Sequence, residues 1–337
     1  MCKIIAADAS KKRDLVMNGK TVAVISDGSA VLGLGNIGPD AALPVMEGKS
    51  LLFKKFANID SIPLVLNTQN TEEIIATVKA LAPSFAGINL EDISAPRCFE
   101  IEKRLSRELD IPVFHDDQHG TAIVVLAGLI NALKISGRNK EQVRIVVNGS
   151  GAAGVAIIKL LNEYGFRHLL VCDSKGIISH DRTDLNITKK KLLKFTNSDS
   201  VTGSLMNALA QADIFIGVSV AGLLTERHIK IMNEDPVVFA LANPDPEIKP
   251  ELAKELGVKI IATGRSDYPN QINNVLVFPG IFRGVIDGNK KVITEKMKIA
   301  AAEALAALVK DPSIEKIVPG PFDAGVMQAV ADAVQNA

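Results

Sequence analysis

Short apolar runs alternate along this chain with longer segments that have helical periodicity. In the first part of the chain, residues 85–90 (FAGINL) and 111–115 (IPVFH) are predicted strands, because each is a continuous apolar run bounded by turn residues. Residues 71–82 and 96–109 have the spacing of amphipathic helices, and a Thr that can cap the first of them stands at its start. Residues 20–38 predict β-rich segments broken by glycine turns. This alternation is typical of a parallel sheet with crossover helices.

The same pattern is clearer in the second part of the chain. A predicted strand at 144–148 (RIVVN) is followed by a predicted helix at 155–165 and a strand at 168–173 (HLLVCD). An apolar helix predicted at 121–136 could link two domains, and an Ala-rich amphipathic helix is predicted at 294–309. Further parallel strands are predicted at 212–219, 237–243 and 258–263. The chain is therefore predicted to be an α/β protein with two domains, which its 337 residues also favour.

The charge balance excludes some kinds of partner. Lys and Arg together number 38, as do Asp and Glu, so no surplus of charge indicates a nucleic acid or a membrane surface as partner. Cys2, Cys98 and Cys172 are widely spaced and have no CxxC pairing, which is typical of a reducing compartment. The most apolar uncharged run, residues 120–133, is shorter than the ~20 residues of a membrane span. We therefore expect a cytoplasmic protein that does not enter a membrane.

The pattern GxGxxG occurs twice, and its context separates the two copies. Gly149, Gly151 and Gly154, with Ala152 and Ala153 between them, follow a predicted strand and open a predicted helix. The backbone N–H groups and the helix dipole at such a position can hold a pyrophosphate. We therefore interpret this copy as a dinucleotide-binding loop.

The other copy, Gly33, Gly35 and Gly38, runs into Pro39 and has no acidic residue at the required distance. We interpret it as turns that pass close to another backbone.

The choice between NAD and NADP stays open on the sequence. Asp173 ends the strand that follows the dinucleotide-binding loop, where a carboxylate can accept a hydrogen bond from an adenine ribose hydroxyl. This favours NAD. Lys175 and the basic run 189–191 could instead approach a 2′-phosphate, although a solvated helix face is the simpler interpretation of that run.

Two acidic pairs predict a second kind of site. Glu91-Asp92 and Asp116-Asp117 each follow a predicted buried strand, and the carboxyl ends of parallel strands are where open α/β sheets bind ligands. Carboxylates gathered there repel one another unless a cation or a proton relieves them. A hard divalent metal ion is the simplest cation for such oxygen ligands. Together with the dinucleotide-binding loop, the acids predict metal-assisted redox chemistry.

Five separate motifs stand in the order of one enzyme family: MEGK, NLED, HDDQHGTA, ANPDPE and YPNQINNVLVFPG. On these motifs the chain resembles malic enzymes of the short bacterial type, from about Lys20 to the C-terminal helix. The resemblance implies oxidative decarboxylation of (S)-malate to pyruvate and CO2, with NAD or NADP and with Mg²⁺ or Mn²⁺. It also implies a homodimer, whereas the expectation of no nucleic-acid partner rests on the charge balance.

The resemblance implies three parts of the chain. Residues 1–120 would form a substrate- and metal-binding domain of α/β type. Residues 121–284 would form a Rossmann-type, doubly wound domain that binds NAD(P). Residues 285–337 would form a helical segment that returns to the first domain.

The family motifs also imply roles for individual residues. Lys49 matches the general base, which must lose its proton to act and therefore needs a lowered pKa. Asp116 matches the acid that pairs with this lysine and tunes it. The metal ligands that the motifs imply are Glu91, Asp92 and Asp117, and three carboxylates suit Mg²⁺ or Mn²⁺ better than zinc.

Polar residues near the predicted strand ends complete the candidate site. Asn243 and Asn274 match side chains that hold the substrate carboxylates, and Asn273 is their neighbour. Ser219 could lie near the nicotinamide or be a buried serine in a βα turn. Arg265 could pair with a substrate carboxylate or form a structural ion pair.

The histidines of the HDDQHGTA motif admit another interpretation. His115 and His119 stand four residues apart, as zinc ligands on a helix do. We favour the carboxylates as ligands and interpret His119 as a hydrogen-bonded residue at a helix start.

One expected residue has no counterpart in the chain. Malic enzymes carry a tyrosine in a segment like YTPGVA that protonates the enolpyruvate intermediate, and the alignment places that segment before Met1. Tyr164 and Tyr268 are the two tyrosines present, and neither matches it. The sequence therefore predicts an N-terminally shortened chain with weakened catalysis, since a general acid commonly contributes about 10²–10⁴-fold in rate.

Two alternatives to the dehydrogenase stay open on the sequence. One is a metal-dependent oxaloacetate decarboxylase on the same fold, which needs no hydride transfer. The other is a non-catalytic nucleotide-binding remnant.

Overall fold

The computed structural model describes residues 1–337, and the chain divides into two compact units. The first division lies between Asp117 and Gln118, near the boundary expected at 120. The C-terminal part of the chain contributes to both units. Unit 1 comprises Met1–Asp117, Val275–Ala301 and Gly325–Ala337, and unit 2 comprises Gln118–Asn274 and Ala302–Ala324.

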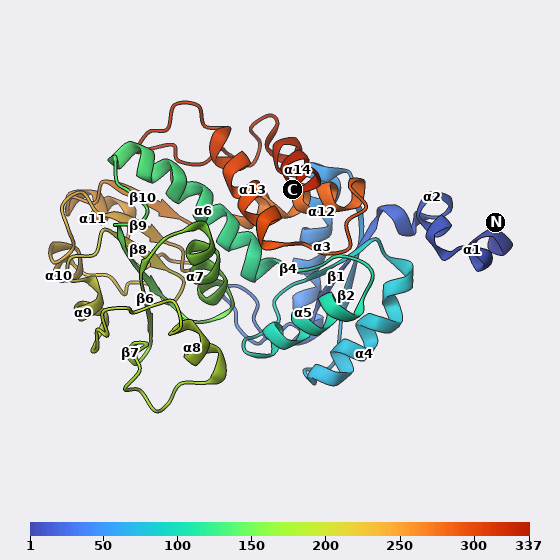
Figure 1. Ribbon diagram of the computed structural model, residues 1–337, viewed down its shortest axis with the longest axis horizontal. Helices are drawn as coiled ribbons and strands as arrows, with labels where there is room; N and C mark the ends of the chain where they lie inside the picture. Colours follow the sequence, from blue (N-terminus) through green and yellow to red (C-terminus); the bar gives the residue numbers. More distant parts are fainter. The chain divides into compact units, whose positions relative to one another are not determined.

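Unit 1 is built on a four-stranded parallel sheet (Figure 1). In spatial order its strands are β2 (Asp60–Val65), β1 (Thr21–Ser26), β3 (Gly87–Leu90) and β4 (Val113–His115). Every residue of β1, β3 and β4 is buried, as expected for strands covered on both faces. The order of the strands reverses between β1 and β3, and open sheets bind ligands at the carboxyl ends beside such a point.

The helices of unit 1 include one long helix that the sequence did not reveal, α3. Helix α4 begins after Asn70, whose side chain accepts hydrogen bonds from the backbone N–H groups of Glu72 and Glu73, so Asn70 and not Thr71 is its cap. Short 3₁₀ turns lie at Ala9–Lys11, Met17–Lys20 and Ala82–Ser84. The helices are α1 (Cys2–Ala7), α2 (Lys12–Leu15), α3 (Gly38–Ala57), α4 (Thr71–Leu81), α5 (Arg97–Glu108), α12 (Phe278–Asp287) and α14 (Val326–Asn336).

Helix α3 is held in place by aromatic packing. The ring of Phe53 makes edge contacts with the rings of Phe278 and Phe282, at centroid distances of 4.8 and 5.2 Å. Phe282 in turn meets Phe114 of β4 at 6.0 Å. These rings are completely buried, so they fix α3 against α12 and the sheet.

Unit 2 is built on a six-stranded sheet. In spatial order its strands are β10 (Ile260–Thr263), β9 (Val237–Ala240), β8 (Ile214–Gly217), β5 (Arg144–Asn148), β6 (His168–Asp173) and β7 (Gly176–Ile177). The five predicted parallel strands are confirmed, and the short antiparallel β7 adds an edge that was not predicted. The strand order reverses at β5, between β6 and β8. The predicted α/β fold with a doubly wound second unit is therefore confirmed.

The helices of unit 2 are mostly short, apart from α6 and α7. Helix α6 begins at Asp116, in the last two residues of unit 1, and most of it is buried within the protein. It is long and apolar enough to cross a membrane, but a mostly buried core helix passes the same test. The helices are α6 (Asp116–Ser136), α7 (Ala152–Tyr164), α8 (Ile187–Leu192), α9 (Leu205–Leu209), α10 (Glu226–Lys230) and α11 (Pro250–Glu255). Helix α13 (Glu295–Ala307) and the 3₁₀ turn at Asn274–Leu276 each contain residues of both units.

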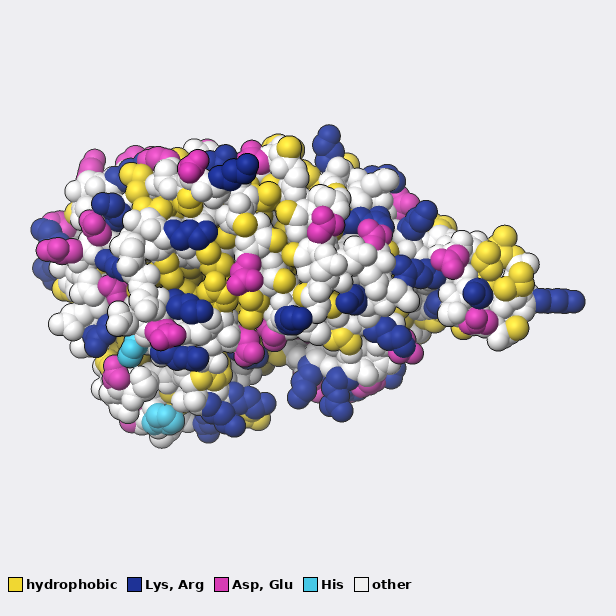
Figure 2. Space-filling model, turned by 45° about the horizontal axis from the view of Figure 1, so that its top comes forward, with side chains coloured by type: hydrophobic (Ala, Val, Ile, Leu, Met, Phe, Trp, Pro, Cys, Tyr) yellow, Lys and Arg dark blue, Asp and Glu magenta, His cyan; other side chains and the backbone are white.

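The charged side chains on the surface are mixed in sign. On the face shown in Figure 2, Lys and Arg side chains are interspersed with Asp and Glu over most of the surface. This agrees with the equal numbers of the two kinds in the sequence.

Candidate functional site

The acidic residues of unit 1 gather at the carboxyl ends of adjacent strands. Glu91 and Asp92 follow β3, and Asp116 and Asp117 follow β4, which pairs with β3 in parallel. The backbone N–H of Asp92 donates to Oδ2 of Asp117 over 2.7 Å, although 25 residues separate them. The structure therefore brings the two predicted acidic pairs together.

Lys49 lies among these acids. It stands on α3, is buried, and its Nζ donates to Oε1 of Glu91 over 3.0 Å and to Oδ2 of Asp116. The ammonium group also lies over the ring of Phe278, 3.9 Å from its centroid. The pairing of Lys49 with Asp116 is thus present in the structure, while the catalytic roles of both residues stay predictions.

The pKa of Lys49 is raised, not lowered as the role of a base requires. Burial alone would lower the pKa of this amine, but the negative charges of Asp116 and Glu91 outweigh it. In the metal-free protein the amine is therefore protonated. A divalent cation beside the carboxylates would take up the same negative charge and lower the pKa of Lys49.

The pKa values of the four carboxylic acids are all raised, chiefly by burial. The pKa of Asp92 rises to about 9, because Asp117 and Glu91 also repel its negative charge. The pKa values of Asp116 and Asp117 rise to about 6, and that of Glu91 is raised as well. Lys49 alone does not balance this many acids, so the cluster attracts protons or a cation.

The oxygen donors of this cluster fit a hard divalent cation better than a soft one. Glu91, Asp92 and Asp117 offer only carboxylate oxygens, and each of the three is repelled by another acid of the cluster. No group of three or more His, Cys, Asp or Glu side chains is arranged as around an ion. The metal ligand set therefore stays a prediction that the chemistry of the donors supports.

Asp92 has an unusual backbone conformation. Its φ of 55° lies in the left-handed region, which Asp adopts more readily than most residues. Its carbonyl accepts a hydrogen bond from Ala30, and its carboxylate is bonded by the backbone of Leu32. The loop of the first glycine pattern therefore packs on the acidic cluster.

The first glycine pattern forms turns, as expected. Gly33, Gly35 and Gly38 all have positive φ. The close approach to another backbone occurs at Gly28, where a Cβ would lie 2.2 Å from the carbonyl oxygen of Gly38. Gly35 and Gly38 themselves have open space at the Cβ position. Their reason to be glycine is therefore the backbone angle.

His115 is buried in the middle of the acidic cluster. Nδ1 of the ring lies 3.8 Å from Oδ2 of Asp117, and the backbone of Ile93 also interacts with the ring. Burial lowers the pKa of His115, so the ring is neutral. His115 and His119, like the carboxylates, do not belong to a group of side chains arranged around an ion, so the choice between the two ligand sets stays a prediction.

The dinucleotide-binding loop of unit 2 has the geometry of its motif. It follows β5, and α7 begins at Ala152, so its backbone lies at a helix N-terminus. A Cβ on Gly154 would lie 1.8 Å from the carbonyl oxygen of Gly149, and Gly149 itself has a φ of 119°. Gly151 has open space at its Cβ position, as a loop that receives a ligand would. The motif is therefore in the predicted strand–loop–helix context.

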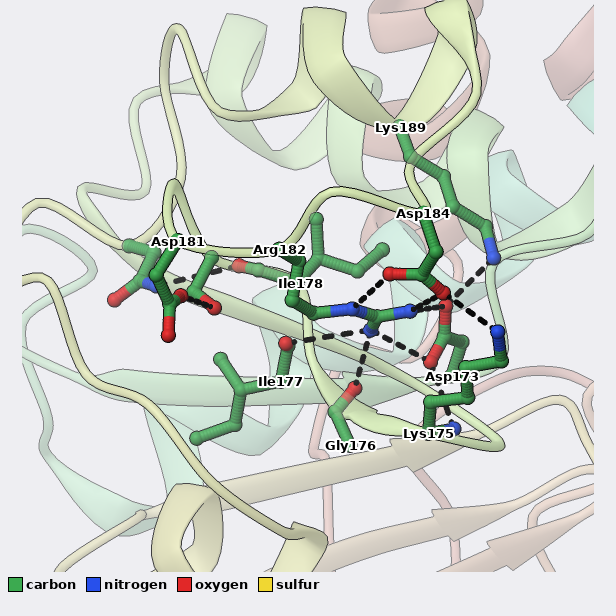
Figure 3. A network of polar contacts seen from close by, with 11 residues as sticks. Asp173, Lys175, Gly176, Ile177, Ile178, Asp181, Arg182, Asp184 and Lys189 are labelled. Atoms are coloured by element: carbon green, nitrogen blue, oxygen red, sulfur yellow. Dashed lines mark hydrogen bonds and ion pairs between the residues drawn. The ribbon is translucent and has the colours of Figure 1, made fainter.

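Asp173 lies at the end of β6, but its carboxylate is already occupied (Figure 3). Its Oδ1 accepts from the backbone N–H of Lys175 over 2.9 Å and from Arg182 over 2.8 Å. Its Oδ2 accepts from Arg182 over 3.1 Å and from Lys189 over 2.6 Å. A carboxylate has about four lone-pair sites, and all are used here. A ribose hydroxyl must therefore displace one of these donors.

Arg182 is held by two acids, whereas Lys189 is held by one. The guanidinium of Arg182 also binds Asp184 through two hydrogen bonds, of 2.9 and 2.8 Å, as Figure 3 shows. Lys189 bonds only Asp173 in this network. These cations lower the pKa of Asp173 against the opposing effect of burial. Lys189 is therefore the donor that a ligand displaces most readily.

Ser219 lies after β8 in a hydrogen-bonded chain. Its hydroxyl accepts from Nδ2 of Asn148 over 2.7 Å, and its backbone N–H donates to Glu247 over 3.0 Å. The residue is exposed, so the alternative of a buried serine in a βα turn is wrong. A position at the carboxyl ends of β5 and β8 is where this type of sheet holds its nucleotide.

The remaining candidate residues of unit 2 lie beyond β9 and β10. Asn243 is half-buried and packs over Gly264, whose Cβ would lie 2.9 Å from its Nδ2. Asn273 and Asn274 are half-buried as well. Arg265 forms an ion pair with Asp267 at 2.7 Å, and its pairing with a substrate carboxylate stays a prediction.

Sequence reasoning missed three residues of these sites. Phe278 stands beneath Lys49 in the motif VFPG, Arg182 pairs with Asp173, and Glu247 is the last residue of ANPDPE. Phe278 and Glu247 both stand inside motifs named in the sequence analysis. Their position in these motifs was the signal that could have identified them. Arg182 had no signal, because its role depends on how the β6–β7 hairpin folds back.

The comparisons with known proteins agree with these observations. The family model described as "Malic enzyme, NAD binding domain" matches residues 118–334, and the model "Malic enzyme, N-terminal domain" matches residues 7–106. The chain is 57% identical over 339 residues to the bifunctional malic/malolactic enzyme of Bacillus subtilis, covering 100% of this chain and 83% of that protein. It is 55% identical over 339 residues to the NAD-dependent malic enzyme of Geobacillus stearothermophilus, covering 100% and 71%.

A solved structure matches nearly the whole fold. The crystal structure of an NAD-dependent malic enzyme from Thermotoga maritima superposes with a TM-score of 0.97 and 51% sequence identity. The match covers 99% of this chain and 89% of that one. Further relatives, 44–49% identical, are named NADP-dependent malic enzymes.

Proposed function

Because the chain belongs to the malic enzyme family, we propose that it catalyses the oxidative decarboxylation of (S)-malate to pyruvate and CO2, with reduction of NAD or NADP. One observation carries this proposal beyond the family. A buried lysine, Lys49, lies within hydrogen-bond distance of two carboxylic acids, beside a further pair that has no cation of its own. Such a cluster suits a reaction that removes a proton next to a metal-bound substrate.

Lys49 is proposed to accept the proton of the C2 hydroxyl of malate as hydride leaves C2. Asp116 would hold the amine in place and take part in passing the proton on. The ring of Phe278 covers the ammonium group on one side and excludes water there. This role requires that Lys49 be neutral when substrate is bound.

Glu91, Asp92 and Asp117 are the residues that would hold Mg²⁺ or Mn²⁺. A divalent ion supplies Lewis-acid chemistry, which acidifies the hydroxyl and favours negative charge on the oxygen after CO2 leaves. These residues would also orient the substrate. Loss of one carboxylate should therefore weaken metal binding and catalysis together.

Unit 2 is proposed to hold the hydride acceptor and the substrate carboxylates. Gly149, Gly151 and Gly154, with Ala152 and Ala153, would bind the pyrophosphate. Ser219 would lie near the nicotinamide and Asp173 near the adenine ribose. Asn243 and Asn274, with Asn273 as a neighbour, would donate hydrogen bonds to the substrate carboxylates without adding charge.

We propose NAD as the preferred nucleotide and NADP as a second one. The carboxylate of Asp173 favours an unphosphorylated ribose, because it would repel a 2′-phosphate. The two cations on Asp173 reduce that repulsion. Relatives named for each nucleotide occur at similar identity, so the family alone does not decide.

A homodimer in the cytoplasm is the proposed working form. The N-terminal segment of unit 1 leaves large apolar side chains exposed, among them Met1, Ile4 and Met17. A second copy of the chain would cover such side chains. Light scattering coupled to size-exclusion chromatography tests this, since a monomer at all concentrations contradicts it.

The activity is tested with purified chain, (S)-malate, Mn²⁺ and either nucleotide, through the near-ultraviolet absorbance of the reduced nicotinamide. Metal-dependent reduction that stops on adding a chelator supports the proposal. Release of CO2 from oxaloacetate without malate oxidation would instead indicate the decarboxylase. Nucleotide binding without either reaction would indicate the non-catalytic alternative.

A further inference from the structure

Glu247 is a buried acid that no predicted role uses. It is completely buried in unit 2 and has no Lys, Arg or His as an ion-pair partner. Its partners are instead N–H and O–H donors of two loops. A buried carboxylate without a cation is unfavourable for stability, so a contribution to stability does not explain why Glu247 is there.

The carboxylate of Glu247 joins the loops that follow two neighbouring strands. Oε1 accepts hydrogen bonds from the backbone N–H of Ser219 over 3.0 Å and from its hydroxyl over 3.4 Å. Oε2 accepts from the backbone N–H of Ala242 over 3.0 Å. Ser219 follows β8 and Ala242 follows β9, so one side chain fixes the spacing between the two loops.

The surrounding backbone is shaped to admit this carboxylate. A Cβ on Gly217, the last residue of β8, would lie 2.4 Å from the carboxyl group of Glu247. The backbone of the same segment is also anchored, because Leu224 donates to the carbonyl of Glu247 over 2.9 Å and Gly222 to that of Pro246 over 3.0 Å. These contacts hold the side chain of Glu247 in one position, where it joins the loops after β8 and β9.

The two bridged loops carry residues proposed to contact different reactants. Ser219 is proposed to lie near the nicotinamide, and Asn243, which follows Ala242 directly, to hold a substrate carboxylate. Asn148 at the end of β5 extends the chain of hydrogen bonds to a third strand end.

We propose that Glu247 is a positioning residue that sets the distance between the nicotinamide-binding and substrate-binding loops. This inference rests on the proposed function. A misplacement of about 1 Å between reacting groups can reduce a rate by about 10²-fold, so such a bridge has a large effect on catalysis.

The substitution Glu247→Gln breaks the bridge with little change in volume. Glutamine has one carbonyl oxygen, and its NH₂ group would face an N–H donor of one of the two loops. Asn197→Ala is the matched control for stability. Asn197 is buried in the same unit, its side chain bonds Ile178 and Val201, and its backbone N–H donates to Leu169 near the start of β6.

The experiment compares kcat, KM for malate and thermal stability of both variants with those of the unaltered chain. We expect Glu247→Gln to lower kcat by about 10²-fold, and Asn197→Ala to lower the melting temperature while kcat stays within about twofold. The inference is overturned if Glu247→Gln keeps both kinetic constants within about twofold. It is also overturned if the two variants have the same melting temperature and their kcat values are reduced by the same factor.

A binding measurement separates this inference from the proposed function. The affinity for NADH includes the nicotinamide half, whereas the affinity for ADP does not. We expect Glu247→Gln to weaken NADH binding by about 10-fold and to leave ADP binding within about twofold, because one charged hydrogen bond to the Ser219 loop is lost. If the unaltered chain fails to oxidise malate but this difference appears, the proposed function fails and the loop-positioning role stands. Equal changes for NADH and ADP overturn the inference.

Discussion

Nζ of Lys49 lies 3.0 Å from Oε1 of Glu91, a residue 42 positions away in the sequence. The contact joins α3 to the end of β3, and Asp116 at the end of β4 binds the same amine. A group proposed as a base is thus held by a proposed metal ligand and by a second acid. The protonation of Lys49 and the binding of a metal ion should therefore be linked.

Replacing Lys49 should abolish most of the activity. Lys49→Arg keeps a cation between Glu91 and Asp116, but a guanidinium stays protonated and cannot act as a base. We expect kcat to fall by about 10²–10⁴-fold, with NADH affinity unchanged. Lys49→Met should lose the same activity and also stability, because the buried acids lose their cation.

Lys55 provides the control for this prediction. It stands on the same helix and is exposed, so Lys55→Met should keep both kcat and the melting temperature. Steady-state kinetics and thermal denaturation measure the two effects separately. Activity of Lys49→Arg within about 10-fold of the unaltered chain would rule out Lys49 as the base.

Stability of the metal-free protein should fall as the pH rises. The pKa of Asp92 is about 9 in the folded protein against its ordinary value of 3.8, and those of Asp116 and Asp117 are about 6. Because the folded state binds more protons than the unfolded state between these values, the free energy of unfolding decreases with pH over that window. The acids contribute no pH dependence below their unfolded pKa values.

Mn²⁺ should restore the free energy of unfolding that is lost as the pH rises. The effect should be stronger at alkaline pH, where the carboxylates have no proton to release. Melting temperatures at pH values of about 6 and 9, with Mn²⁺ or with a chelator, measure the effect. Asp92→Asn should remove most of the pH dependence above about 6 in the chelated protein. A melting temperature that responds to neither pH nor Mn²⁺ would show that the carboxylates are not a metal site.

The fold was predicted where strands are buried on both faces. The runs at 144–148 and 168–173 are continuous apolar segments, and they form β5 and β6. β2 was not predicted because it is a partly exposed edge strand that contains Pro63. Helix α3 was missed because Gly48 and two prolines interrupt its pattern.

The candidate site was predictable as far as it depends on the ends of strands. The acids after β3 and β4 could be placed together, because adjacent parallel strands bring their carboxyl ends to one edge. The charge state of Lys49 could not, because burial and the neighbouring acids act in opposite directions. The saturation of Asp173 could not be predicted either, since Arg182 reaches it only through the hairpin after β6.

Two glycines of the dinucleotide-binding loop should respond differently to alanine. A Cβ on Gly154 would lie 1.8 Å from the carbonyl oxygen of Gly149, so Gly154→Ala should displace α7 from β5 and lower the melting temperature. Gly151 has open space, so Gly151→Ala should fold normally. It should nevertheless weaken nucleotide binding, because the added methyl group would stand where the pyrophosphate approaches the backbone.

Thermal denaturation and calorimetric titration with NADH separate these two outcomes. Gly151→Ala serves as the folding control for Gly154→Ala, and each variant is measured for both properties. Unchanged NADH affinity in Gly151→Ala would place the pyrophosphate elsewhere. An unchanged melting temperature in Gly154→Ala would contradict the close packing of the loop.

Removing Lys189 should shift the preference from NADP toward NAD. Lys189 occupies one acceptor site of Asp173, and it is the donor with no other partner in that network. Lys189→Ala frees that site for a ribose hydroxyl and removes a cation that a 2′-phosphate would pair with. Both changes act in the same direction, so the ratio of kcat/KM for NADP to that for NAD should fall by about 10-fold or more.

Lys190 is exposed on the same helix, and Lys190→Ala should leave the ratio unchanged. A ratio that moves equally in both variants would mean that the basic run acts through its general charge, and a ratio that moves in neither would place the adenine ribose away from Asp173.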